Sequence, residues 1–378
     1  MHKPGRKKLL YIVNSSNYFL SHRSDIALSA KEQGFQIFVA SPNDDEKKKL
    51  EQKGFIHQEI SLSRSGKQVF KELKTLLNIF KVIKRIKPDL VHLITIKPVI
   101  YGGIVTSLLK VKGAVLAVPG LGYSYIATGI RASIFRLFLA ILYKMAFRKN
   151  NIKVVFQNEE DKKIISKASG LNKNKIALIK GSGVDLDKYS FKPIPKGRPI
   201  ISMASRLQKD KGVTEYYEAA KILKEKGVEA DFYFIGSLDS NYANEIEKKE
   251  LMEWKKSNVV NFLGYRDDIN MLFHKSTIIV LPSYREGFPK VLQEAAASGR
   301  PVITSDVPGC RDAVKNGLTG FLINPRDSKV LAEKILFLLG NKSLLKKMGV
   351  EARKLAEREF SSNKVVEEHL KIYKDLLK

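Results

Sequence analysis

The sequence predicts an α/β protein made of two successive domains, each a parallel sheet with helices on both faces. Short apolar runs alternate with longer helical stretches along the whole chain, which is the pattern of doubly wound parallel sheets. A proline-rich, basic stretch without periodicity, residues 190–198, separates two such series as a linker would. At 378 residues the chain is long enough for two or three domains with cores of their own.

The first series contains seven expected strands, each ending in a polar or glycine-rich loop. They span residues 9–13, 35–40, 55–60, 88–94, 114–118, 152–156 and 176–179. A helix that Gly34 stops at Gln33 follows the first strand, and a long amphipathic helix covers residues 68–87. In such sheets ligands bind beyond the carboxyl ends of the strands, so these loops are candidate binding positions.

The second series predicts strands at residues 199–204, 232–235, 259–263 and 277–281 and leads to the stretch 284–299. Pro289 suits the first turn of a helix because it has no N–H to lose there, and Gly299 closes that helix. Glu286 then lies on the preceding loop. Glu294 lies one to two turns into the helix, from where its side chain leans back toward the loop.

Backbone amides are expected to converge beside these two glutamates, because the first turn of a helix leaves its N–H groups free. They belong to Gly287, Phe288, Lys290 and Val291. Two carboxylates beside a row of amides suit a ligand with both hydroxyls and phosphates, such as a nucleotide sugar. The alternative is that the spacing is accidental and that Lys290 and Glu294 form a surface i,i+4 pair.

A basic loop opens the second series. Arg206 and Lys211 follow the strand at 199–204 and precede a helix start, where a diphosphate would be stabilised, and both are expected on an exposed loop. Taken alone, such residues are usually only solvated. In the first series, Gly120 and Gly122 give a weak dinucleotide-binding signal because Tyr125 stands where a third glycine is expected.

Composition excludes several classes of protein. The hydrophobic content of 44% indicates a globular chain. A single cysteine, Cys310, rules out an intramolecular disulfide and fits a reducing compartment, and the histidines lack metal-ligand spacing, so no metal site is expected. The longest apolar stretch, residues 133–147, contains Arg136 and Lys144, and the amino-terminal apolar run is too short for a signal peptide. A cytosolic protein without a membrane span is therefore expected.

Charge is distributed unevenly along the chain, whose formal net charge is +28. Residues 1–200 carry 37 Lys and Arg against 14 Asp and Glu, residues 201–378 carry 30 against 25, and residues 101–150 carry seven bases and no acid. The first half is thus expected to face something anionic, either nucleic acid or a membrane leaflet. No aromatic-basic motif favours nucleic acid.

The expected helix at residues 68–87 is the candidate membrane-facing element, because bases surround an apolar stripe on it. The bases are Lys71, Lys74, Lys81, Lys84, Arg85 and Lys87, and the stripe is Phe70, Leu73, Leu77, Phe80 and Ile83. The alternative is a core-packed helix with a solvated basic face.

The order of motifs in the second half resembles the donor domain of the family-4 retaining glycosyltransferases. The order begins with a strand, Glu-Gly-Phe-Pro, a helix that contains a glutamate, and Gly-Arg-Pro. Asp306-Val-Pro-Gly309 and Asn316-Gly-Leu-Thr-Gly-Phe321 follow. Glu286 and Glu294 match the Glu-x7-Glu element of that family, and Arg206 and Lys211 its Arg-x4-Lys pair. The resemblance implies the GT-B architecture, with two Rossmann-like domains around a cleft and a last helix that crosses back to the first domain.

The resemblance also assigns the parts of the chain. Residues 1–192 with helix 360–378 would form the acceptor- and membrane-facing domain, and residues 198–359 the donor domain. Arg206 and Lys211 would neutralise the leaving diphosphate, so that no metal or other cofactor is expected. Glu286, the third expected catalytic residue, would hold the donor sugar.

Further donor contacts follow from the same resemblance. Glu294 would bind the ribose hydroxyls, and the loop 264–268, with Tyr265 and Arg266, would cover the base. The remaining donor-binding residues are Gly287, Phe288, Pro289, Lys290 and Val291.

The amino-terminal half resembles bacterial enzymes that extend lipid-diphosphate-linked sugars, through residues 18–23, 95–103 and 120–123. The expected acceptor or cleft residues are Asn17, His22, Arg23, Lys97, Gly120, Gly122 and Asn158. Residues 15–17 replace a glycine pair that many family members have, and residues 119–122 replace a histidine that touches the donor sugar. The resemblance therefore leaves the donor sugar open.

The sequence thus predicts a retaining glycosyltransferase on the inner face of the cell membrane. It would move a hexose or N-acetylhexosamine from a nucleotide, expected to be UDP, to a polyprenyl-diphosphate-linked saccharide in polysaccharide, O-antigen or glycoprotein glycan assembly. A GT-B isomerase such as a UDP-sugar 2-epimerase is the second hypothesis and needs acid and base groups around the sugar. A non-enzymatic polyanion-binding protein is the third, and it leaves Glu286 and Glu294 unexplained.

Overall fold

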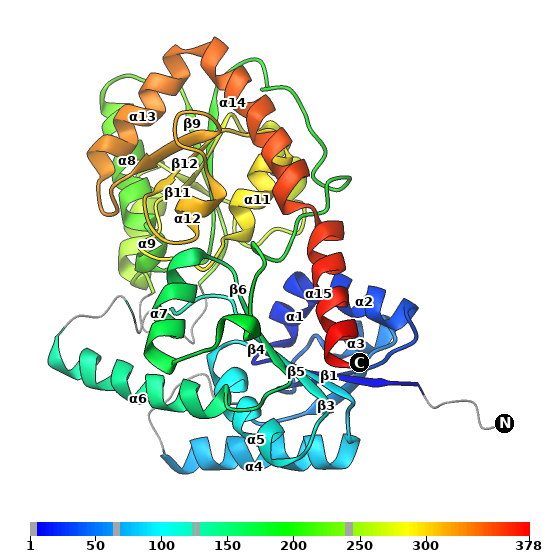
Figure 1. Ribbon diagram of the computed structural model, residues 1–378. Helices are drawn as coiled ribbons and strands as arrows, with labels where there is room; N and C mark the ends of the chain where they lie inside the picture. Colours follow the sequence, from blue (N-terminus) through cyan, green and yellow to red (C-terminus); the bar gives the residue numbers. More distant parts are fainter. Residues whose placement is uncertain (1–5, 63–68, 123–124, 126–128, 239–244) are drawn as a thin grey trace. The chain divides into compact units, whose positions relative to one another are not determined.

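The computed structural model describes residues 6–62, 69–122, 125, 129–238 and 245–378, with the side chains of residues 69–71 excepted. The chain divides into two compact units, residues 1–182 with 363–378 and residues 183–362. Each unit is built on one wholly parallel sheet with helices on both faces, which confirms the predicted fold class (Figure 1).

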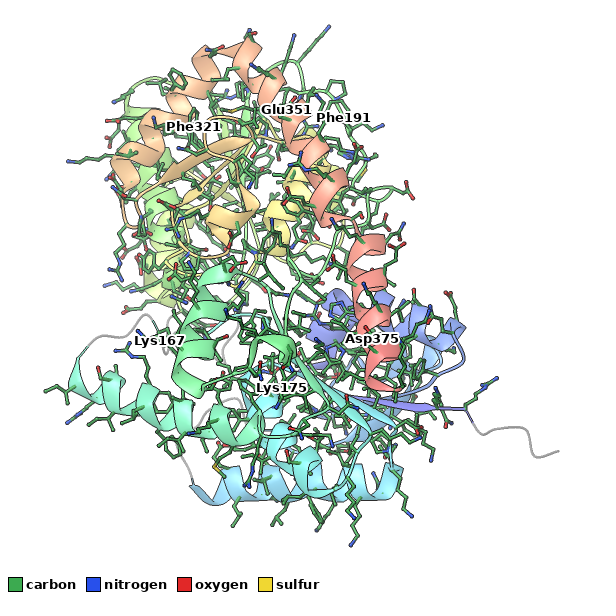
Figure 2. All side chains as sticks on the ribbon, viewed as in Figure 1. Lys167, Lys175, Phe191, Phe321, Glu351 and Asp375 are labelled. Atoms are coloured by element: carbon green, nitrogen blue, oxygen red, sulfur yellow. The ribbon has the colours of Figure 1, made fainter. Side chains whose placement is uncertain are left out.

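The division between the units precedes the expected linker, because residues 190–198 belong to the second unit. The guanidinium of Arg300, fully buried in that unit, donates to the carbonyls of Lys192 at 2.9 Å and Pro193 at 3.2 Å. The ring of Phe191, labelled in Figure 2, packs so closely that a Cβ on Gly299 would lie 2.5 Å from it. This stretch is therefore anchored to the second unit rather than being a free linker.

The first sheet has the strand order β3-β2-β1-β4-β5-β6-β7. All seven predicted strands are confirmed, with ends moved by two residues at most, because buried Val, Ile and Leu runs define them. They are β1 (Lys8–Ile12), β2 (Gln36–Ser41), β3 (Ile56–Glu59), β4 (Leu90–Ile94), β5 (Gly113–Val118), β6 (Ile152–Phe156) and β7 (Ile176–Leu178).

Two layers of helices cover this sheet. One face packs against α4 (Val69–Ile86), η1 (Pro98–Gly102), α5 (Gly103–Leu108), α6 (Ile130–Ala146) and α7 (Glu159–Ser169). The other packs against α1 (Ser16–His22), α2 (Ser24–Glu32), α3 (Lys47–Gln52) and α15 (Ser362–Leu376). The helix predicted to end at Gln33 is two helices, since the backbone of Arg23 leaves the helical region at φ −135°.

The orientation of α4 agrees with the expected apolar stripe at Leu73 and Leu77 and departs from it at Ile83. Its buried side chains belong to Thr75, Ile79, Val82, Ile83 and Ile86, so Ile83 faces the core. Leu73 and Leu77 instead point away from the core, with about half of each side chain exposed. The predicted stripe is thus divided between two sides of the helix, while Phe70 and Lys71 lie outside the described side chains.

The last helix, α15, belongs to the first unit over residues 363–378, which confirms the predicted return of the chain. The Tyr373 hydroxyl lies 3.0 Å from the Tyr11 hydroxyl and 2.6 Å from His92 Nδ1. His369 stacks on His92 at 5.6 Å between ring centroids. The carboxyl end of α15 is fixed by Asn151, whose side-chain amide donates to the Leu376 carbonyl at 2.9 Å.

The second sheet has the order β10-β9-β8-β11-β12-β13. Its strands are β8 (Ile200–Ala204), β9 (Asp231–Ile235), β10 (Asn261–Phe262), β11 (Ile278–Leu281), β12 (Val302–Ser305) and β13 (Gly320–Ile323). The helices are α8 (Val213–Glu225), α9 (Lys248–Lys256), α10 (Ile269–Lys275), α11 (Lys290–Ala297), α12 (Cys310–Ala313), α13 (Ser328–Gly340) and α14 (Lys342–Leu355). Short helical turns are η3 (Lys173–Lys175) in the first unit and η4 (Lys209–Lys211) and η5 (Ala356–Phe360) in the second. Across the described ranges, no helix has the length and apolarity needed to cross a bilayer.

The buried histidines under α15 generate a prediction about pH. Burial lowers the pKa of His369 to about 3 and that of His92 well below its usual value. The unfolded chain therefore binds more protons than the folded one below pH about 6.5, and stability falls with pH there by up to about 1.4 kcal/mol per unit for each histidine.

We expect the unfolding midpoint in urea to be nearly constant from pH 8 to 7 and to drop between pH 6.5 and 5. His369→Gln should flatten that drop, because glutamine carries no titrating group. A decline that is equally steep in this variant would contradict the assignment.

Candidate functional site

The second sheet reverses its winding direction between two neighbouring strands. From β8 the chain winds outward through β9 to β10, and from β11 it winds the other way through β12 to β13. The loops after β8 and β11 therefore diverge from adjacent strand ends, which is the position where open α/β sheets bind ligands. Every predicted catalytic residue follows one of these two strands.

Backbone contacts hold the two loops together. The Tyr284 amide donates to the Asp210 carbonyl at 2.9 Å. Gly212 has φ +77°, and a Cβ there would lie 2.2 Å from the Pro282 carbonyl oxygen. Only glycine satisfies both the left-handed backbone and this close approach. The position of Lys211 relative to the second loop is consequently fixed by the backbone.

Lys211 and Glu286 form an ion pair across these loops. The Lys211 ammonium lies 2.6 Å from Glu286 Oε1, which also accepts a hydrogen bond from the Ser283 hydroxyl at 2.8 Å. The two charged side chains are only 15% and 14% exposed. This corrects the expectation that Lys211 lies on an exposed loop, since the neighbouring β11 loop covers it.

A second close approach supports Glu286 from behind. Gly309, after β12, has φ +77°, and a Cβ there would lie 2.3 Å from the Gly287 carbonyl oxygen. Buried Cys310 follows it, and burial, then the charge of Glu286, raises the pKa of its thiol well above the usual value. Cys310 is therefore a small packing residue here, not a thiolate nucleophile.

Glu294 is held in a different environment, on α11. Its side chain is almost wholly buried, accepts a hydrogen bond from the Tyr189 hydroxyl, and lies 3.9 Å from the Lys290 ammonium. Burial raises the pKa of Glu294, and Lys290 and Tyr189 oppose that rise. Such a carboxylate retains acceptor capacity for the hydroxyls of a ligand.

The amino end of α11 differs slightly from the prediction. Pro289 is the N-cap residue, with an extended ψ of 126°, and the helix begins at Lys290. The first-turn amides, including those of Lys290 and Val291, have no partner within the helix. The Phe288 side chain is buried against Phe360, with ring centroids 5.4 Å apart, so only its backbone is available to a ligand.

The remaining predicted donor residues lie on loops at the same edge of the sheet. Arg206 is exposed directly after β8, beside Gly236, where a Cβ would clash with the Ser205 carbonyl. Gly236 in turn donates to the Gly264 carbonyl at 2.8 Å, which fixes the start of loop 264–268.

Within loop 264–268, Arg266 is bound by its neighbour Asp268. The guanidinium makes a bidentate pair with that carboxylate at 2.7 and 2.6 Å. Tyr265 is 67% exposed. An exposed aromatic ring on a loop at this edge is available to stack on a base.

Several side chains in this region were not predicted as site residues. The Tyr189 hydroxyl bound to Glu294 and the Ser283 hydroxyl bound to Glu286 both orient a predicted carboxylate. The Tyr284 hydroxyl donates to Glu215 Oε1 at 2.7 Å, and the Arg326 guanidinium lies 4.5 Å from its ring centroid. Tyr189 and Arg326 are distant in sequence from the motif, so no local pattern marks them, whereas Ser283 directly precedes it.

The candidate acceptor residues of the first unit have more varied surroundings. Asn17 is exposed on α1, and His22 stacks on Tyr18 with ring centroids 4.2 Å apart. Arg23 is buried and donates to the His22 carbonyl at 2.9 Å, so its side chain is not on the surface.

Gly122 has φ +62°, with open space where a Cβ would be, and Gly120 precedes it after β5. Tyr123 lies outside the described residues.

Two candidates have structural partners. Lys97 forms an ion pair with Glu72 at 2.7 Å, and that carboxylate also accepts from the Tyr101 hydroxyl at 2.7 Å. Asn158 is the N-cap of α7 and accepts from the Asp161 amide at 2.7 Å. Both residues are thus engaged in holding helices of the first unit.

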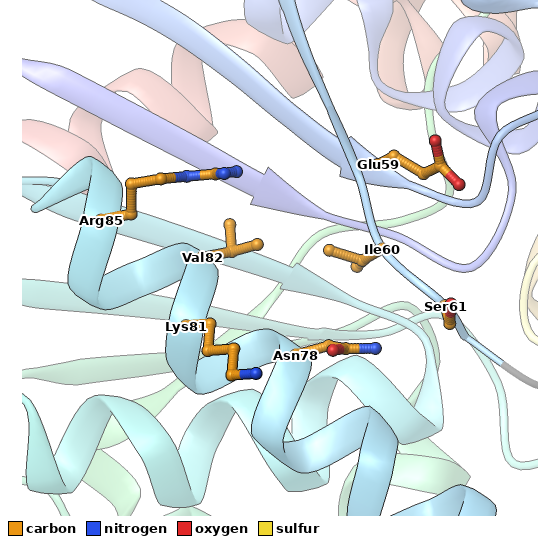
Figure 3. Close-up of a pocket in the computed structure, with 7 residues that line it drawn as sticks. All are labelled: Glu59, Ile60, Ser61, Asn78, Lys81, Val82 and Arg85. Atoms are coloured by element: carbon orange, nitrogen blue, oxygen red, sulfur yellow. The ribbon is translucent and has the colours of Figure 1, made fainter.

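A surface pocket of about 300 Å³ lies elsewhere in the first unit, between the end of β3 and α4 (Figure 3). Lys81 and Arg85 project from α4, and Glu59 comes from the strand end. None of the predicted site residues lines it. The candidate donor site lies instead at the strand ends of the second sheet.

Comparison with known proteins identifies the family. Residues 187–355 match the family Glycosyl transferases group 1, and residues 8–158 match the family Glycosyl transferase 4-like. A Campylobacter jejuni N,N'-diacetylbacillosaminyl-diphospho-undecaprenol alpha-1,3-N-acetylgalactosaminyltransferase is 31% identical over 382 residues, 95% of this chain and 98% of the relative. The chain belongs to the family-4 retaining glycosyltransferases.

Two further similarities bear on this glycosyltransferase. An Escherichia coli UDP-Gal:alpha-D-GlcNAc-diphosphoundecaprenol alpha-1,3-galactosyltransferase is 28% identical over 68% of each chain. The crystal structure of Anabaena HepE in complex with UDP and glucose superposes with a TM-score of 0.78 at 20% identity, covering 97% of this chain and 99% of that one. The latter likeness establishes the GT-B fold and nothing about specificity.

The ion pair predicts different stability effects for the two basic residues. Lys211→Ala leaves Glu286 without its counter-charge in a mostly buried place, so we expect a loss of about 2 kcal/mol in the free energy of unfolding. Adding Glu286→Gln should recover part of that loss. Exposed Arg206→Ala should change stability by less than about 0.5 kcal/mol. Urea unfolding of the wild type and these three variants measures this, and equal effects of Lys211→Ala and Arg206→Ala would contradict the geometry.

Because Glu294 is buried, we expect its replacement to affect protein stability and UDP binding in different ways. Because its folded-state pKa lies above the ordinary 4.5, the ionised form costs stability as pH rises through that range. Glu294→Gln should therefore keep or raise the melting temperature at pH 7 while weakening UDP binding about tenfold. Titration calorimetry and thermal unfolding test this, with Glu351→Gln, at a partly buried glutamate on α14 that pairs with Lys354, as the control. Unchanged UDP affinity would remove Glu294 from the site.

Proposed function

We propose that the enzyme transfers a hexose or N-acetylhexosamine from a UDP-linked donor to a saccharide carried on polyprenyl diphosphate. The donor would bind at the switch point of the second sheet, and the acceptor at the first unit. The reaction would take place at the inner face of the cell membrane, with the enzyme held peripherally on anionic lipid. No nucleic acid takes part.

The Lys211–Glu286 pair carries the donor part of this proposal. It places a cation and a carboxylate at adjacent strand ends, beside the first-turn amides of α11. A diphosphate needs positive charge and N–H donors, and a sugar needs hydroxyl acceptors. Glu294, in the middle of α11, would add an acceptor for ribose hydroxyls. In a nucleotide sugar the diphosphate joins the sugar to the ribose, so the diphosphate would lie at Lys211 and the α11 amides, with Glu286 toward the sugar and Glu294 toward the ribose.

Charge stabilisation by fixed side chains is the chemistry that this site supports. As the bond between the anomeric carbon and the diphosphate oxygen breaks, negative charge develops on the diphosphate, where Lys211 and Arg206 would receive it. Glu286 already accepts hydrogen bonds from Lys211 and Ser283. It is therefore suited to orient Lys211 and a sugar hydroxyl rather than to attack carbon. We propose that no divalent metal is needed.

The acceptor part of the proposal rests on relatives. The names of the Campylobacter and Escherichia coli proteins both specify an acceptor linked to undecaprenol through a diphosphate. The basic character of residues 1–200 supports an anionic acceptor and an anionic surface. The names of these relatives favour transfer over a 2-epimerase, which would need acid and base groups around the sugar.

Transfer assays with purified enzyme test the function. We expect transfer from a UDP-sugar to a synthetic polyprenyl-diphosphate saccharide, with the α-anomer of the donor giving an α-linked product. Arg206→Ala should lower the rate about a hundredfold, equivalent to about 3 kcal/mol.

Two controls accompany this assay. EDTA should leave the rate unchanged, and a loss that Mg²⁺ or Mn²⁺ restores would contradict the metal-free site. Conversion of the UDP-sugar to its 2-epimer without acceptor, and no transfer with acceptor, would replace the proposal with the isomerase.

A further inference from the structure

Helix α6 of the first unit carries an uncovered apolar face. Seven large apolar side chains on this one helix are between 48% and 81% exposed. They are Ile130, Ile134, Phe135, Leu137, Phe138, Ile141 and Met145. Isolated exposed apolar residues are normal on any protein, but a contiguous set marks an interaction surface.

The positions of these residues show that the face is a stripe. Ile130, Ile134, Leu137 or Phe138, Ile141 and Met145 recur at spacings of three or four, which places them on one side of an α-helix. The opposite side is buried against the sheet through Leu139, Ala140, Tyr143 and Ala146. The helix therefore has two apolar faces, and its own unit covers only one of them. Figure 1 shows α6 on the outside of the first unit, on the same side of the sheet as α4.

Charge along the same segment points to an anionic partner. Arg131, Lys144 and Arg148 are exposed and lie within one turn of stripe residues, and residues 101–150 contain no acid at all. Their long side chains can extend past the apolar stripe and place their charges at lipid headgroups. A second copy of this chain would bring like charges together along the face, which disfavours self-association. An apolar stripe flanked by bases and free of acids is the pattern of a helix that lies in a membrane interface.

We propose that α6 docks the first unit on an anionic lipid bilayer by inserting the stripe Ile130–Met145 at the level of the headgroups. This inference rests on the proposed function, because a lipid-linked acceptor is presented at that surface. With 17 residues, α6 would lie in the interface over about 25 Å. It replaces α4 as the main membrane contact, since α4 exposes only Leu73 and Leu77 among its described large apolar side chains.

Flotation with vesicles tests the docking without any need for catalysis. The probes are vesicles of phosphatidylcholine alone and of phosphatidylcholine mixed with phosphatidylglycerol. The wild-type enzyme should float with the mixed vesicles, and binding should weaken as salt rises because the charges are screened. The triple variant Ile134→Gln, Leu137→Gln, Ile141→Gln should lose at least about tenfold in vesicle affinity.

A matched control uses exposed apolar residues of the second unit. Met252→Gln, Leu336→Gln and Val350→Gln replace side chains of comparable exposure and should leave flotation unchanged. Circular dichroism and UDP affinity should be unaltered in both triple variants, which separates docking from folding. If the α6 variant floats like the wild type, the proposal is overturned. A wild type that fails to float but forms a dimer that the α6 variant lacks also overturns it and assigns the face to a second copy.

Transfer assays separate this inference from the proposed function. The α6 variant should lose transfer to a vesicle-embedded polyprenyl-diphosphate acceptor but keep transfer to a short-chain, water-soluble one. Equal transfer by wild type and variant to the embedded acceptor would contradict a role for α6 in acceptor access. If the wild type floats yet uses neither acceptor, the docking stands and the proposed acceptor fails.

Discussion

The ion pair between Lys211 and Glu286 is the contact on which the candidate donor site depends. Lys211 follows β8 and Glu286 follows β11, and these strands are neighbours only because the sheet reverses its winding between them. The pair is mostly buried, so each charge needs the other, and removing one would leave an uncompensated charge. Gly212 and Gly309 make the same arrangement possible on the backbone side, because a Cβ at either position would collide with the β11 loop. The loops are thus preorganised before any ligand arrives, which is what electrostatic stabilisation of a leaving group requires.

Around this pair, the two glutamates have distinct physical settings that suit distinct parts of a nucleotide sugar. Glu286 is neutralised by a lysine, whereas Glu294 is buried, bound by a tyrosine hydroxyl and raised in pKa. A buried carboxylate costs stability at neutral pH, and an enzyme retains such a cost when the group serves binding. The first unit has a basic surface and one helix, α6, with an exposed apolar face. We connect both features with the proposed lipid-linked acceptor.

Much of the fold could be predicted from the sequence, because the buried strands are dense in Val, Ile and Leu and are bounded by polar loops. The seven strands of the first sheet and the return of α15 were predicted. The break at Arg23 was not, since it carries no glycine or proline signal, and neither was α3, which spans only six residues although Gly54 follows its C-cap. The stripe expected on α4 was only partly right, because the helix leaves Leu73 and Leu77 exposed but turns Ile83 into the core. Periodicity shows that a helix has an apolar side, and tertiary packing decides which side is covered.

In the site, the loops after β8 and β11 were predicted from motif order, and the structure brings Lys211 and Glu286 within 2.6 Å. Their direct pairing, and the hydroxyls of Ser283 and Tyr189 that hold the carboxylates, could not be read from spacing. The Lys211–Glu286 and Tyr189–Glu294 contacts join residues distant in sequence, whose distance only the fold defines. Ser283, by contrast, lies three residues before Glu286, and its contact depends on the shape of the loop. The prediction that Lys211 is exposed was wrong because the neighbouring loop, distant in sequence, covers it.

A crystal structure of the enzyme with UDP tests the account most directly. We expect the diphosphate to lie within hydrogen-bond distance of Lys211 and Arg206, at the ends of β8 and β11, and a ribose hydroxyl to bind Glu294. The Lys211–Glu286 pair should persist or open only enough to admit phosphate. UDP bound in the first unit, or in the second unit away from these strand ends, would contradict it.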